Sequence, residues 1–116
     1  MNEIFHALAD DTRRAMLRDL AQGERTVSEL AEPHPMSLQA ASKHIKVLEK
    51  AGLIQREIRW RTHWCRLDPT PLAKAHQELG FYERFWTTRL DALDRILREE
   101  DAQGAKTSRK DQGDDQ

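Results

Sequence analysis

Apolar residues recur every three or four positions along most of this chain, which is the spacing of one face of an α-helix. The pattern predicts two helices near the N-terminus: a short one with Ile4, Phe5 and Leu8 on one face, and a second over residues 11–22 with Leu17 and Leu20 inward. Asp10 directly precedes the second helix and can cap it, and Gly23 can end it.

Two more helices follow, separated by prolines. Thr26 and Glu29 form a capping-box pattern at the start of the third helix, and Pro33 and Pro35 end it because proline cannot donate within a helix. Ser37 caps the fourth helix. Its expected inward residues, at spacings of three and four, are Leu38, Ala41, Ile45 and Leu48, and Gly52 provides the exit.

An alternating pattern then replaces the helical one. Residues 54–60 predict a strand with Ile54, Ile58 and Trp60 on one side, residues 64–67 predict a returning strand, and residues 60–63 must form the turn. The longest helix is expected from Leu72 to about Glu99. Its apolar residues repeat at three or four positions: Leu72, Ala75, Leu79, Tyr82, Trp86, Leu90, Leu93 and Leu97.

This order of elements predicts a mainly α fold with a small β-hairpin, the winged helix-turn-helix. The winged helix-turn-helix domain is expected to span residues 1–99. Residues 100–116 have only alanine as apolar content and are predicted to be a disordered tail. With one cysteine and no long apolar run, the sequence indicates no internal disulfide, no membrane segment and a cytoplasmic setting.

The start of the fourth helix has an unusual composition. Residues 37–48 contain no acid, although the chain has 20 acids among 116 residues. Free amides at a helix N-terminus attract anions, and Ala40 stands where the third helix has Glu29. The candidate DNA-binding residues are Ser37, Gln39, Ala40, Ser42, Lys43, His44 and Lys46. Gln39, Ser42 and Lys43 can reach base edges, and His44 and Lys46 suit flanking phosphates.

A solvated polar helix face is the alternative interpretation, and the charge distribution decides against it. Residues 37–67 hold seven Lys or Arg and two acids, a balance of +5. Because the whole chain carries −1, the remaining residues carry −6. A basic fourth helix and hairpin between acidic ends is typical of a protein that binds duplex DNA.

Three segments in order, "FHALADDTRRAMLRDLAQGERTVSELA", "SKHIKVLEKAGLI" and "CRLDPTPL", resemble the ArsR-type winged-helix transcriptional regulators. The resemblance covers residues 4–97 and is closest to the metal-independent branch with "LADPTRR" near its start. It implies a homodimeric bacterial repressor, often autoregulatory, that binds an operator in double-stranded DNA. It places the fourth helix in the major groove, with Gln39, Ser42, Lys43 and His44 in the reading segment and Arg59 and Arg61 at the wing tip.

The resemblance also implies a dimer interface made by the first and last helices. The residues concerned are Ile4, Phe5, Leu8, Leu79, Tyr82, Trp86, Leu90, Leu93 and Leu97. An effector pocket lined by Phe81, Tyr82 and Trp86 is an alternative, but the long regular stripe favours a dimer seam.

The sequence departs from the family pattern at three places. Asp11 replaces the usual proline, and the wing lacks a glycine at its tip. Metal-sensing members carry a cysteine pair on the third helix or an Asp/His set on the last, and neither is present here. No cofactor is expected.

Several residues have a plain interpretation beside a functional one. His63 and Cys65 alternate onto one strand face, but two ligands are too few for zinc, so a packed cysteine and an exposed histidine are expected. His6 and His76 could pair across a dimer, although such histidines usually only pack or hydrogen-bond. Trp60 and Trp64 could stack on bases, but are expected to cover apolar surface of the hairpin.

The patterns leave three function classes to compare: a DNA-binding regulator, a protein-contact module and an enzyme. A sequence-specific DNA-binding regulator is favoured, with an unknown effector. A winged-helix module for protein contact would have a neutral or apolar fourth-helix front, and a sensor with a non-standard metal or small-molecule site stays an alternative. An enzyme is excluded because the chain has no glycine-rich phosphate loop, no nucleophile with a base at motif spacing and no metal set.

Overall fold

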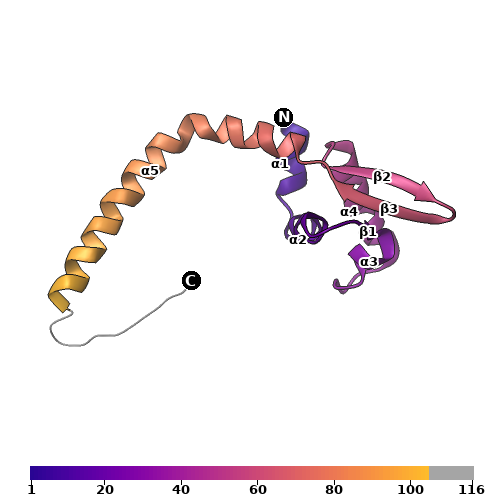
Figure 1. The fold of residues 1–116 in the computed structure, drawn as a ribbon, viewed down its shortest axis with the longest axis horizontal. Coiled ribbons are helices and arrows are strands. Elements are labelled where there is room, and N and C mark those ends of the chain that lie inside the picture. The colour runs from indigo at the N-terminus through magenta and orange to yellow at the C-terminus, as the bar shows by residue number, and fades with distance from the viewer. Residues whose placement is uncertain (105–116) are drawn as a thin grey trace. The chain divides into compact units, whose positions relative to one another are not determined.

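A computed structural model of the chain describes residues 1–104 (Figure 1). The elements in order are α1 (Asn2–Leu8), α2 (Asp11–Ala21), β1 (Arg25–Thr26), α3 (Val27–Ala31), α4 (Leu38–Lys50), β2 (Ile54–Arg59), β3 (Thr62–Leu67) and α5 (Thr70–Gly104). The chain has two compact units, Met1–Glu78 and the part from Leu79 on, and α5 runs through the boundary between them. The first unit contains the expected mainly α fold with a β-hairpin.

Each of the three expected helix caps is present. The Asp10 carboxylate accepts a hydrogen bond from the Arg13 amide at 3.0 Å, and this bond lowers the pKa of Asp10. The Thr26 hydroxyl accepts from the Glu29 amide at 3.1 Å while the Glu29 carboxylate accepts from the Thr26 amide at 2.8 Å, which completes the capping box. The Ser37 hydroxyl accepts from the Ala40 amide at 3.1 Å.

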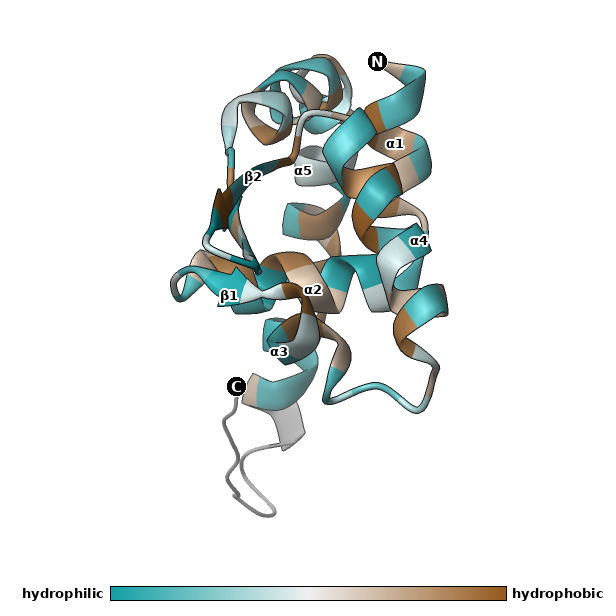
Figure 2. Ribbon diagram, turned by 90° about the vertical axis from the view of Figure 1, so that its right-hand side faces the viewer, coloured by the Kyte–Doolittle hydropathy of each residue, from teal (hydrophilic) through white to brown (hydrophobic). Residues whose placement is uncertain are grey.

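The core of the first unit is formed by the inner faces of α2, α3 and α4 with β2 and β3. Brown and teal alternate along α1 and α4 in Figure 2, as expected of helices with one apolar face. The buried residues of this core are Ala7, Met16, Leu17, Leu20, Leu30, Ala31, Ala41, Ile45, Leu48, Leu53, Ile54 and Cys65. The expected inward positions of α2 and α4 are therefore confirmed, with one exception.

Leu38 was predicted to face inward and does not. Its side chain is 55 % exposed, although it continues the spacing of Ala41 and Ile45. Leu38 is the first residue of α4, and this first turn extends beyond the packed core. Its spacing therefore places Leu38 on the inward side of the helix at a point where there is no core to cover it.

The sheet has three strands in the order β1-β3-β2, both pairs antiparallel. The sequence analysis missed β1, in which Arg25 pairs with Cys65 and Thr26 with Trp64. A strand of two residues is too short to produce an alternating pattern. It nevertheless positions α3, because Thr26 both ends β1 and caps α3.

The hairpin turn is tighter than predicted. The strands extend to Arg59 and from Thr62, so only Trp60 and Arg61 connect them, rather than residues 60–63. Trp60 has a φ of 61°, a left-handed conformation that costs about 1–2 kcal/mol for a residue with a side chain. The prediction that Trp60 covers apolar surface is wrong: its side chain is 97 % exposed because the wing extends beyond the core.

Helix α5 is longer than predicted at both ends. It starts at Thr70 and ends at Gly104, so residues 100–104 of the predicted tail are helical, and the rest of that tail lies outside the described residues. At its start, Leu72 packs against the core and Ala75 is buried. From Leu79 on, its large apolar side chains are exposed. No helix of residues 1–104 has a stretch long and apolar enough to span a membrane.

Candidate nucleic-acid interface

The first turns of α4 present a polar, acid-free surface. Gln39, Lys43 and Lys46 are exposed, while Ala41 and Ile45 on the opposite side are fully buried. A shallow hollow of about 460 Å³ lies along this outer side, lined by Leu38, Gln39, Ser42, Lys43 and Lys46. The structure therefore places most of the predicted reading residues on one face.

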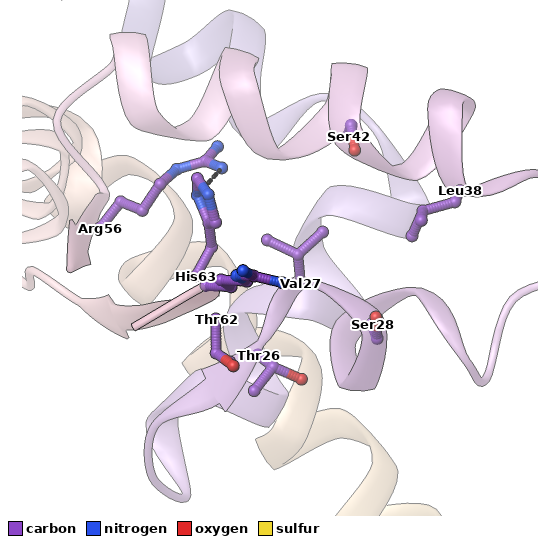
Figure 3. A pocket seen from close by; sticks show the side chains of 9 residues that line it. Thr26, Val27, Ser28, Leu38, Ser42, Arg56, Thr62 and His63 are labelled. Carbon is purple, nitrogen blue, oxygen red and sulfur yellow. Dashed lines mark hydrogen bonds between the residues drawn. The ribbon is translucent and has the colours of Figure 1, made fainter. Parts of the chain in front are cut away.

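A second hollow of about 380 Å³ separates this face from the wing (Figure 3). Its lining comes from three elements: Thr26, Val27 and Ser28 at the start of α3, Leu38 and Ser42 on α4, and Arg56, Arg61, Thr62 and His63 on the wing. Leu38 and Ser42 line both hollows. The outer face of α4 thus continues into a cleft whose other wall is the wing and its tip.

The wing is tied to α4 by Arg56. Its guanidinium donates two hydrogen bonds to the Glu49 carboxylate, at 3.1 and 3.3 Å. A third guanidinium nitrogen lies 3.2 Å from Nδ1 of His63, the contact drawn in Figure 3. Sequence reasoning counted Arg56 only as one of the basic residues of the middle segment, because its partner Glu49 is seven positions away on another element.

The two wing-tip arginines differ in their surroundings. The Arg59 guanidinium lies 2.9 Å from Glu24 and 2.8 Å from Glu57, and 5.2 Å from the centre of the Trp64 ring. These partners raise the pKa of Arg59, and the hydrogen bond from Arg59 lowers the pKa of Glu57. Arg61 is exposed and forms no hydrogen bond or ion pair with any residue of the range 1–104. Only Arg61 therefore presents an uncommitted charge at the tip.

His44 points to the helix junction rather than to the outer face. Its Nδ1 lies 3.1 Å from the Arg13 guanidinium and 3.7 Å from the Asp10 carboxylate. Arg13 is only 8 % exposed, and it also donates to the backbone carbonyls of Ala7 and His6 at 2.8 and 2.9 Å. Sequence reasoning missed Arg13, because a basic residue in a charged helix gives no indication that it is buried.

The candidate metal residues are not brought together. Cys65 is fully buried, which raises the pKa of its thiol, and His63 contacts Arg56. His6 and His76 are exposed. In the part of the chain that the structure describes, no three His, Cys, Asp or Glu side chains group as metal ligands would.

The predicted dimer residues fall into two sets. On α5, the stripe of Leu79, Tyr82, Trp86, Leu90, Leu93 and Leu97 is between 43 % and 57 % exposed. On α1, Phe5 and Leu8 are half-buried, but Ile4 is only 8 % exposed and has little surface left for a partner. Of the three residues of the alternative effector pocket, Phe81, Tyr82 and Trp86, the rings of Phe81 and Tyr82 meet edge to face at 4.9 Å between centres.

The sequence and the fold of this chain are similar to those of known regulators of transcription. A family described as "Helix-turn-helix domain" matches residues 8–57. The chain is 40 % identical over 103 residues to the HTH-type transcriptional regulator Rv2034 of Mycobacterium tuberculosis (strain ATCC 25618 / H37Rv), which covers 89 % of this chain and 91 % of that protein. It is 32 % identical over 72 residues to the transcriptional repressor SdpR of Bacillus subtilis (strain 168), covering 62 % of this chain and 80 % of that protein.

A solved structure shows the same similarity. The crystal structure of the ArsR family transcriptional regulator RHA00566 has 41 % identity and a TM-score of 0.69, covering 74 % of this chain and 89 % of that one. The protein is thus a winged helix-turn-helix, DNA-binding regulator of transcription, and not an enzyme. More narrowly, it belongs to the ArsR family. The resemblance to the ArsR family stated from the sequence is confirmed, and its metal-independent branch stays a prediction.

Proposed function

We propose that the protein is a homodimeric repressor that recognises a specific operator through the outer face of α4. The observation that carries this proposal is the start of α4: it is capped by Ser37, has no acid in its first turn, and borders the wing across a shared cleft. A helix start of this kind accepts phosphate oxygens or approaches a groove without charge repulsion.

The exposed side chains of this face divide by role. Gln39 and Ser42 contact base edges in the major groove, and Lys43, one turn beyond Gln39, does the same. Lys46 and Arg61 contact phosphates, which set affinity and register rather than sequence preference. Ser37 and Ala40 leave the backbone open to close approach. His44 and Arg59 contribute indirectly, since both are held by partners within the chain.

The dimer is supported by the exposed apolar stripe of α5. A monomeric helix with six large apolar side chains about half exposed would leave a contiguous patch in water, and such patches mark interaction surfaces. The spacing of three and four residues matches a seam between two helices. We propose that the stripes of two chains pair, with Phe5 and Leu8 of α1 at the edge of the seam.

Changing Leu90 and Leu93 to Glu places two charges in this seam and should give monomers with weakened DNA binding. Sedimentation velocity measures the change. Thr87→Glu with Thr88→Glu is the matched control, because it adds the same charge to exposed positions outside the stripe. If the Leu90 and Leu93 variant sediments like the unchanged protein, the seam is wrongly assigned.

Repression is supported by the similarity to SdpR, which is described as a transcriptional repressor. Selection of bound duplexes from a random-sequence pool tests the proposal as a whole. A symmetric dimer should enrich an inverted repeat with half-sites about 10 base pairs, or a multiple, apart. Footprinting upstream of the chain's own coding region then tests autoregulation, and enrichment of no sequence would contradict specific recognition.

We also propose that DNA binding is independent of metal. The support is chemical: α3 contains no cysteine, and Cys65 is buried away from solvent. Affinity for the selected duplex should be the same with and without a chelator. A loss of affinity in chelator that zinc restores would instead indicate a metal site outside the family positions.

A further inference from the structure

Trp60, at the tip of the wing, is the most exposed large apolar side chain among residues 1–104. It is 97 % exposed, and it occupies the first position of the two-residue turn between β2 and β3 with a φ of 61°. Glycine or asparagine adopts this conformation more easily than tryptophan does. Both the backbone conformation and the exposed indole therefore oppose the stability of the free chain.

No contact of Trp60 within the described residues compensates for its strained backbone and exposed indole. The neighbouring tryptophan, Trp64, is half-buried beneath the Arg59 guanidinium, so it has the packing role that Trp60 lacks. Residues that break a local rule without a gain in folding are expected at functional sites. The position of Trp60 thus points to a role in a complex.

Ion pairs of β2 hold the backbone next to Trp60 in a defined place. Arg59 joins the tip to Glu24, next to β1, and to Glu57 on β2. Arg56 joins the same hairpin to Glu49 of α4. The β2 side of the turn is thus held by ion pairs, so placing the indole against a partner costs little backbone freedom.

The charges near the tip favour a polyanion as this partner. Arg59 and Arg61 flank Trp60, and Arg61 lines the cleft that α4 shares with the wing. A protein interface centred on Trp60 would need more apolar surface around it, and only Ile58, 62 % exposed, adds a large apolar side chain to the tip. An aromatic ring next to the uncommitted charge of Arg61 instead suits a duplex, with its stacked bases, sugars and phosphates.

We propose that Trp60 is a DNA-contacting residue that enters the minor groove next to the major groove occupied by α4. This inference rests on the proposed function, in which the outer face of α4 meets DNA. The indole packs on deoxyriboses or partly between base pairs while Arg61 contacts an adjacent phosphate. Apolar side chains that enter the minor groove favour flexible pyrimidine–purine steps, so the wing adds a preference for deformable sequence that base-edge contacts do not supply.

The test compares variants of Trp60 on the duplex selected by the full-length protein. Trp60→Ala should weaken binding about 5- to 100-fold, the range expected for one lost aromatic contact to DNA, with an unchanged salt slope. Trp60→Phe should retain most of the affinity. Trp60→Asn should weaken binding like alanine while raising the melting temperature or leaving it unchanged, because asparagine relieves the strained turn.

A modified duplex locates the groove. Replacing adenine by 2,6-diaminopurine at positions next to the half-site adds an amino group in the minor groove alone. It should weaken binding of the unchanged protein and have little effect on Trp60→Ala. Trp60→Ala that binds as tightly as the unchanged protein would overturn the inference, as would loss of affinity only through a changed oligomeric state, which would assign Trp60 to a protein contact. If Gln39→Ala weakens binding while Trp60→Ala does not, the proposed function stands and this inference alone fails.

Discussion

Helices α3 and α4 begin with the same kind of cap and then differ in the third residue. Thr26 and Ser37 each accept a hydrogen bond from the third amide of their helix at 3.1 Å. In α3 that third residue is Glu29, whose carboxylate returns to the Thr26 amide. In α4 it is Ala40, and the first turn carries no acid.

Because of this difference, the positive end of α3 is already occupied by a carboxylate of its own, whereas the positive end of α4 can bind an anion. The Glu29 carboxylate occupies the positive end of α3, so a phosphate there would meet like charge. The start of α4 has the same backbone geometry without that carboxylate, and Gln39, Lys43 and Lys46 lie along its outer face. One side chain at the third position is thus enough to assign different roles to two neighbouring helices of one motif.

On their inner sides the two helices should behave alike. Leu30 and Ile45 are both fully buried, so Leu30→Ala and Ile45→Ala should each lower the free energy of unfolding by about 2–5 kcal/mol. Leu38→Ala is the control, and it should have a much smaller effect because Leu38 is 55 % exposed. Urea denaturation measures all three. An equal loss for Leu38→Ala would show that the start of α4 is packed after all.

On the outer side, Gln39→Ala should cost about 1–3 kcal/mol of binding free energy on the selected duplex and little on random DNA. The reason is that an amide side chain in the major groove distinguishes base edges, whereas random binding depends on phosphates. Titration of both duplexes at one salt concentration measures the difference. Lys50→Ala, at the other end of α4, is the control and should change neither affinity. Equal losses on both duplexes would assign Gln39 to the backbone.

The charged residues should show the opposite behaviour. Lys46→Ala and Arg61→Ala should weaken binding to selected and random duplexes alike and lower the salt slope by about one each. Arg59→Ala should change the slope less, because the Arg59 guanidinium is already held by Glu24 and Glu57. Affinity measured over a range of salt concentrations tests this order, and a larger slope change for Arg59 than for Arg61 would contradict it.

The smallest expected effect concerns the cap of α2, the carboxylate Asp10. Folding lowers the pKa of Asp10 below 3.8, so its stabilising contribution is present above that pH and is lost as the pH falls through the folded-state pKa. Asp10→Ser should fold at neutral pH, because serine also caps well. Its stability should not include the loss that protonation of the Asp10 carboxylate causes in acid. Melting temperatures between about pH 5 and pH 2 compare the two proteins. If the melting temperatures of the two proteins depend on pH in the same way, Asp10 does not cause the loss of stability in acid.

The sequence predicted the helices, their caps and the acid-free outer face of α4, because these depend on short-range patterns. Capping residues at fixed spacing identified the starts of α2, α3 and α4, and the lack of acids marked the outer face of α4. Long-range contacts were not predictable in this way. The pairing of β1 with β3, the contact of buried Arg13 with His44 and the ion pair of Arg59 with Glu24 all join residues far apart in the chain.

Two errors have a common physical cause. Leu38 and Trp60 both continue an apolar pattern, and both lie where an element extends beyond the core. Periodicity tells which side of an element a residue occupies, but not whether the core reaches that far. In both cases the exposed apolar residue lies beside the proposed DNA surface, as expected where function rather than folding determines the residue.

The central claim is that the start of α4 faces DNA, and Ala40→Glu tests it most directly. This change gives α4 the capping box of α3, so the domain should remain folded, as circular dichroism would show. Ala40→Gln is the matched control, since glutamine has the same size and also suits a capping box but carries no charge. We expect Ala40→Glu to abolish binding to the selected duplex while Ala40→Gln retains most of it. If Ala40→Glu is folded and binds with unchanged affinity, α4 does not meet DNA at its N-terminus and the account is wrong.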